Sequence, residues 1–176
     1  MTAIQLLFDS GDPVSIYSLA ANAWEVIDAL CDKASVDSIS SQTREHLPEG
    51  KDLKRDYVNS PYRNFFKHAD RDPDAVLPSF DESNVDSIIF LAVEDYLRLL
   101  KKSPVEFQVF LLWYLAANVE KVSTDSLHEI LQSIESTFPN IRDLPRKERI
   151  VMGRRVLEDA LKDNELVRDN RTEAAF

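Results

Sequence analysis

Hydrophobic residues recur at three- and four-residue spacing along most of the chain, which is the pattern of amphipathic helices. The longest pattern begins at Asp12-Pro13, an N-cap residue followed by proline at the first helical position, and continues to about residue 34. Further patterns predict helices at about residues 85–102, 105–119, 124–138 and 145–166. The helix at 85–102 is apolar nearly all round, which indicates a central position. Its Glu94 and Asp95 could be buried carboxylates, but a narrow polar stripe accounts for them.

Shorter elements are predicted between these helices. Residues 4–8 predict a helical turn and "GKDLKRDYV", residues 50–58, a brief helix, whereas the serine-rich residues 35–50 predict a loop. The polar tail is expected to fray from about residue 167. No alternating strand pattern, internal repeat or low-complexity tract is present. The sequence therefore predicts an all-α fold, with residues 1–176 forming a single helical-bundle domain of six or seven helices.

Composition narrows the class of protein. A chain of 176 residues with 44% hydrophobic content can bury a core, and only three glycines argue against a glycine-rich phosphate loop. No apolar run approaches the roughly 20 residues that span a bilayer, and the first residues lack the basic region of a secretory signal. Cys31 is the single cysteine, so neither a disulfide framework nor a thiolate metal cluster is expected. These features favour a cytoplasmic protein with no membrane attachment.

Charge is unevenly distributed along the sequence. The formal net charge of -10 disfavours non-specific nucleic-acid binding, because phosphates are repelled at long range. Residues 51–71, however, carry six basic and three acidic side chains, whereas residues 1–50 carry two basic and eight acidic ones. This cationic region is either a solvated surface or an anion site.

The stretch "SPYRNFFKHADRDP", residues 60–73, forms the end of this cationic region. Ser60-Pro61 predicts a helix start, and helical spacing then places Tyr62, Phe65 and Phe66 on one face. An arginine fork suits phosphate oxygens, a histidine can transfer a proton near neutral pH, and an asparagine one turn before that histidine can orient its imidazole. The opposite, outward face is expected to carry all of these groups: Arg63, Asn64, Lys67, His68 and Arg71.

The segment "RNFFKH", Arg63 to His68, resembles the Arg-x4–6-His motif of the HEPN (higher eukaryotes and prokaryotes nucleotide-binding) superfamily, in which a polar residue, often Asn, follows the arginine. The resemblance implies an all-α homodimer with facing motif helices and metal-independent RNA cleavage. It implies that Arg63 binds the phosphate, His68 transfers the proton and Asn64 positions them, without any cofactor. RNA and an antitoxin-type protein are the implied partners. The motif covers six residues, and more than half of the chain follows it, whereas family motifs commonly lie late in the domain.

Two non-catalytic interpretations remain open for the same helix. In the first, its basic residues pair with nearby carboxylates such as Asp56, Asp70 or Asp72, and the chain is a helical interaction or dimerisation protein. In the second, Arg63, Lys67 and Arg71 bind an anion or a nucleotide without turnover.

No metal site is predicted. The segment from Asp70 to Asp81 has oxygen ligands at positions 1, 3, 5 and 12 of a calcium-type loop. It has Ala75 where such a loop requires glycine, and aspartate in place of the final glutamate. An acidic loop after a helix end accounts for this segment.

Overall fold

The computed structural model describes residues 1–67, 70, 73–77, 79–121 and 127–173. Within these ranges the regular elements are all helical, and no strand is formed. The prediction of an all-α fold is confirmed, although nine α-helices are present in the described ranges where six or seven were expected. None of the helices in these ranges is both long and apolar enough to cross a membrane.

The chain divides into two compact units. One comprises Tyr17–Leu99, and the other combines Met1–Ile16 with Leu100–Phe176. The single-domain interpretation stays a prediction.

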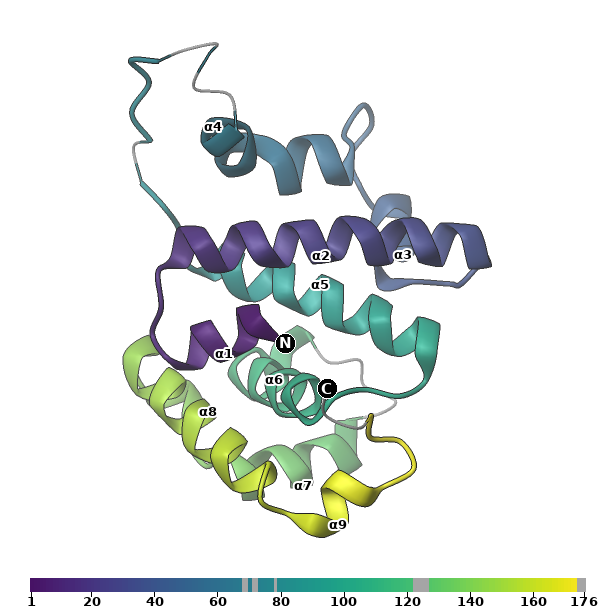
Figure 1. Ribbon diagram of the computed structural model, residues 1–176, viewed down its shortest axis with the longest axis vertical. Coiled ribbons are helices and arrows are strands. Elements are labelled where there is room, and N and C mark those ends of the chain that lie inside the picture. The colour runs from purple at the N-terminus through teal and green to yellow at the C-terminus, as the bar shows by residue number, and fades with distance from the viewer. Residues whose placement is uncertain (68–69, 71–72, 78, 122–126, 174–176) are drawn as a thin grey trace. The chain divides into compact units, whose positions relative to one another are not determined.

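The unit Tyr17–Leu99 is built around a long helix. This helix, α2 (Pro13–Ala34), buries Tyr17, Trp24 and Cys31, which are seven residues apart and therefore lie on one side of it. A second long helix, α5 (Ser83–Leu100), buries Val85, Ile88, Ile89, Ala92 and Val93. The remaining helices of this unit are α3 (Ile39–Glu45), η1 (Leu53–Arg63) and α4 (Asn64–Lys67) (Figure 1).

The prediction of a loop over residues 35–50 is wrong for α3. The Ser38 hydroxyl accepts a hydrogen bond from the Ser41 backbone N–H at 2.9 Å and so caps this helix. Ser40 is fully buried, and its hydroxyl accepts a hydrogen bond from Trp24 Nε1 at 2.8 Å. Serines are frequent in loops, but here tertiary partners satisfy their hydroxyls and the segment becomes helical.

The second unit surrounds the apolar helix α6 (Val105–Ala117). This helix contacts α1 (Thr2–Phe8), α7 (Leu127–Thr137) and α8 (Arg146–Ala160). The core of this unit contains Phe8, whose ring packs edge-on against Trp113 with centroids 5.6 Å apart. The shorter elements are η2 (Val119–Lys121), η4 (Ile141–Asp143) and α9 (Asn164–Arg168).

The last predicted helix is divided in the structure. Instead of one helix over 145–166, α8 ends at Ala160 and α9 begins at Asn164, because the Asp163 carboxylate caps α9 by accepting from the N–H groups of Glu165 and Leu166. The tail, expected to fray from about residue 167, is held at two points. The Ser103 N–H donates to the Arg171 carbonyl at 3.1 Å, and the Glu173 N–H donates to the Ser103 carbonyl at 3.0 Å.

Candidate functional site

The motif helix begins where the sequence predicts. Ser60 has extended backbone angles (φ -104°, ψ 138°) between helical residues, so η1 is interrupted there and a new helical segment starts at Pro61. This segment continues through Arg63 into α4, which ends at Lys67. Residues Pro61–Lys67 therefore form the short helix that carries the first part of the motif.

Arg63 does not lie on an outward face. Its side chain is only 7% exposed, and its Nη2 atom forms an ion pair with Glu25 Oε2 at 2.5 Å. The same atom donates to Asn22 Oδ1 at 2.6 Å, and Nη1 donates to Asn59 Oδ1 at 3.1 Å. The prediction of an exposed Arg63 is wrong, because α2 offers a carboxylate and an amide oxygen that pair with Nη2 of this guanidinium. Its Nε is buried and has no acceptor among the described residues.

The burial of the aromatic residues shows which side of the helix Pro61–Lys67 faces the core. Tyr62 is buried against Phe80, with ring centroids 4.5 Å apart, whereas Phe65 and Phe66 are only half-buried. Consecutive helical residues differ by 100°, so burial of both Tyr62 and Arg63 turns the inward side roughly 60° from the aromatic face that the sequence predicts. The inward side thus combines one aromatic ring with one cation.

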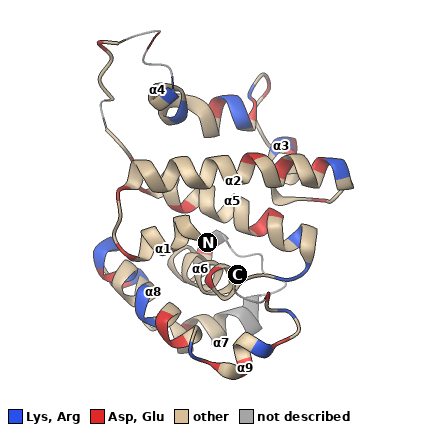
Figure 2. Ribbon diagram, viewed as in Figure 1, with Lys and Arg blue, Asp and Glu red and all other residues tan. Residues whose placement is uncertain are grey.

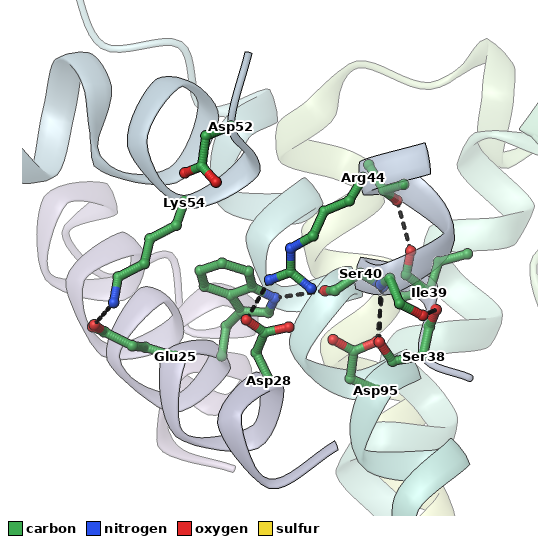
Figure 3. A network of polar contacts seen from close by, with 12 residues as sticks. Glu25, Asp28, Ser38, Ile39, Ser40, Arg44, Asp52, Lys54 and Asp95 are labelled. Atoms are coloured by element: carbon green, nitrogen blue, oxygen red, sulfur yellow. Dashed lines mark hydrogen bonds and ion pairs between the residues drawn. The ribbon is translucent and has the colours of Figure 1, made fainter. Parts of the chain in front are cut away.

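Glu25 links the two halves of η1 to α2. Its Oε1 forms an ion pair with Lys54, which precedes the interruption at Ser60, and its Oε2 pairs with Arg63, which follows it. Figure 3 shows the Lys54 side chain reaching Glu25. Hydrogen bonds from Lys54 and Arg63 lower the pKa of the Glu25 carboxyl. This group of three charged side chains, the Glu25 clamp, fastens η1 to α2.

The other predicted site residues are not gathered around Arg63. Asn64 and Lys67 are exposed on α4, and His68 and Arg71 lie outside the described residues. A cavity of about 250 Å³ lies among α2, η1 and α5, and none of its lining residues belongs to the motif. The structure therefore brings Arg63 together with Glu25, Asn22 and Asn59, which the sequence analysis did not single out.

A second polar group in this unit centres on Asp95, which is fully buried on α5. Its Oδ1 accepts a hydrogen bond from the Ser40 N–H at 3.1 Å, and its backbone carbonyl accepts from Cys31 Sγ at 3.5 Å. Oδ2 is buried and accepts no hydrogen bond from the described residues. Nearby, Asp28 pairs with Arg44 at 2.5 Å (Figure 3). Asp95 is therefore a buried carboxylate, and the expectation of a narrow polar stripe is wrong at this residue. Burial raises the pKa of its carboxyl.

Replacing Asp95 with asparagine is expected to stabilise the protein at neutral pH, by on the order of 1 kcal/mol. Asparagine keeps an oxygen for the Ser40 N–H and carries no charge in the core. Because the folded-state pKa of Asp95 is raised, its contribution to stability is full below the unfolded value of about 4 and declines as the pH rises through the folded-state pKa.

The advantage of Asp95→Asn over the wild type should therefore grow as the pH rises above about 4. Urea denaturation at a series of pH values measures it. Asp32→Asn, an exposed position on α2, serves as the control and should show little change. Equal stability of wild type and Asp95→Asn at every pH would contradict the assignment.

No family model, curated protein or solved structure matches the chain. In the part of the chain that the structure describes, no three His, Cys, Asp or Glu side chains are grouped as a metal site requires.

Proposed function

We propose that this chain is a non-catalytic helical interaction protein, in which Arg63 is a structural residue. The ion pair between the buried Arg63 side chain and the partly exposed Glu25 carries this proposal. A phosphate-binding arginine must present free N–H groups to its ligand. In Arg63, Nη2 is instead bonded to Glu25 and Asn22, and Nη1 is bonded to Asn59. The remaining Nε has no acceptor among the described residues, but it is buried and so is not presented to a ligand.

Magnitudes favour this proposal over RNA cleavage. For Arg63 to bind a phosphate it would have to leave Glu25 and Asn22. Because Glu25 is partly exposed, the loss is about 1.5–3 kcal/mol, as for a hydrogen bond to a charged group. A penalty of that size weakens binding about ten- to a hundredfold. The same argument disfavours an anion or nucleotide site without turnover, because that site shares Arg63. The HEPN-like activity, RNA and an antitoxin-type partner thus remain expectations of the resemblance alone.

An interaction role is also supported by the surface of α2. Leu19, Val26 and Leu30 are three large apolar side chains left exposed on one helix. An exposed apolar surface of this kind is typical of a protein–protein contact.

We further propose a cytoplasmic location. The single cysteine, Cys31, is buried and forms no disulfide, which agrees with a reducing compartment.

The proposed function predicts that the chain does not cleave RNA through its motif. A mixed RNA pool would be incubated with wild type and with His68→Ala, with and without a chelator. We expect no chelator-resistant cleavage above background in either protein. Chelator-resistant cleavage that His68→Ala abolishes, with helicity unchanged by circular dichroism, would overturn the proposal.

A further inference from the structure

One side of α2 carries an unpartnered apolar stripe. Leu19, Val26 and Leu30 are 42%, 60% and 47% exposed, and Ala23 between them is exposed as well. Their spacing of four, three and four residues places all four on one side of the helix, and we call them the α2 stripe. The opposite side of the same helix is buried in its own unit, so α2 is apolar on both sides. Helices of that kind are normally covered on both sides.

We infer that the α2 stripe pairs with the α2 stripe of a second copy of this chain, in an antiparallel arrangement about a two-fold axis. This inference rests on the proposed interaction role and identifies its partner. It assigns the contact to α2 and not to the motif helix.

Neutral surroundings allow two acidic chains to meet at this place. Residues 13–24 of α2 contain no charged side chain, and Figure 2 shows this part of the helix in tan. Of the three carboxylates that follow, Glu25 is paired with Lys54 and Arg63, and Asp28 is paired with Arg44. The third, Asp32, is exposed but lies roughly 150° around the helix from the stripe. The net charge of -10 would repel a second copy elsewhere. Beside the stripe that repulsion is locally reduced.

The ends of the stripe carry opposite charges, which selects the antiparallel orientation. Asp12 precedes α2, and Lys33 lies in its last turn; both are exposed. They are separated by 33 − 12 = 21 residues, three heptads, so they share the side of the helix that carries the stripe. A parallel pair would place Asp12 beside Asp12 and Lys33 beside Lys33. An antiparallel pair brings each lysine near the aspartate of the other copy.

With a two-fold axis between Ala23 and Val26, every residue of the α2 stripe contacts a stripe residue of the second copy. Leu19 then packs against Leu30 of the second copy, and Ala23 against Val26, with the small alanine allowing close approach. Lys33 comes within about one helical turn, roughly 6 Å along the axis, of Asp12 in the other copy. The 22 residues of α2 extend about 33 Å. A single pair of helices of this length gives an interface near the lower end of specific contacts, so a micromolar dissociation constant is expected.

Light scattering coupled to size exclusion tests the inference on the full chain, from about 1 to about 200 µM. We expect the wild type to shift from monomer to dimer across this range and Val26→Asp to stay monomeric with unchanged helicity. Val151→Asp is the matched control, because Val151 is also an exposed helical valine, on α8, and this variant should dimerise like the wild type. A wild type that is monomeric throughout, or a Val26→Asp variant that dimerises like Val151→Asp, would overturn the inference.

Cysteine cross-linking tests the orientation. An oxidised mixture of Leu19→Cys and Leu30→Cys chains should form a covalent dimer between the two variants, whereas each variant alone should not. Preferential Leu19→Cys self-linking would indicate parallel helices and overturn the antiparallel arrangement. The native Cys31 is fully buried and should not react. RNA cleavage in the preceding assay would contradict the proposed function without changing these measurements, so the two failures are distinguishable.

Discussion

Replacing Gly153 with alanine is expected to destabilise the protein by about 2–3 kcal/mol, the opposite of the usual effect inside a helix. In an ordinary helix this change stabilises by up to about 1 kcal/mol. Gly153, however, lies in α8 where a Cβ atom would come within 2.2 Å of Phe8 Cε1 and 2.7 Å of Cδ1. Phe8 is 2% exposed and packs against Trp113, so its ring has little room to move.

Chemical denaturation of Gly153→Ala, Phe8→Leu and the double variant measures this effect. The smaller leucine side chain should relieve the overlap with the new methyl group. The double variant should therefore lose less stability than the sum of the single changes, by about 1 kcal/mol or more. A Gly153→Ala variant that is more stable than the wild type would show that α1 and α8 do not approach so closely.

Replacing Arg63 with alanine is expected to lower the free energy of unfolding by about 2 kcal/mol, as for the loss of hydrogen bonds to a charged group. The change removes the ion pair to Glu25 and leaves Asn22 and Asn59 without their donor. Glu25 is partly exposed and retains Lys54, so the loss should be smaller than for a fully buried ion pair. Lys67→Ala, at an exposed position of the same short helix, is the control and should change stability by less than about 0.5 kcal/mol.

The Glu25 clamp also predicts how this effect depends on pH. Lys54 and Arg63 lower the folded-state pKa of Glu25 below its unfolded value of about 4.3. The stability that the clamp contributes is therefore present above that pH and is lost as the pH falls through the folded-state pKa. The difference between wild type and Arg63→Ala should shrink in acid. Equal effects of Arg63→Ala and Lys67→Ala at neutral pH would contradict a structural role for Arg63.

Hydrophobic spacing was sufficient to predict the long helices. The pattern around Tyr17, Trp24 and Cys31 predicts a helix over residues 13–34, and the structure has α2 at Pro13–Ala34. The same holds for α5 and α6. This success has a physical basis, because a helix of several turns repeats its buried side often enough for the period to show in the sequence.

The short helices α1 and η1 lie where short helical segments were predicted, but α3 was predicted as a loop. Ser38 and Ser40 are typical of loops in isolation, yet α3 forms because Ser38 caps it and because Trp24 and Asp95 bond to Ser40. A helix of seven residues has too few turns for periodicity to outweigh composition, and its stability depends on tertiary contacts.

The motif helix shows most clearly what the local sequence determines and what the tertiary structure decides. Local spacing correctly placed a helix start at Pro61, but it assigned Arg63 to the outward side because a charged residue is usually exposed. The acceptors that bury Arg63, Asn22 and Glu25, lie about 40 residues earlier in the chain. Periodicity reports which residues share a side of a helix, whereas the direction of that side is decided by the partners that the folded chain brings against it.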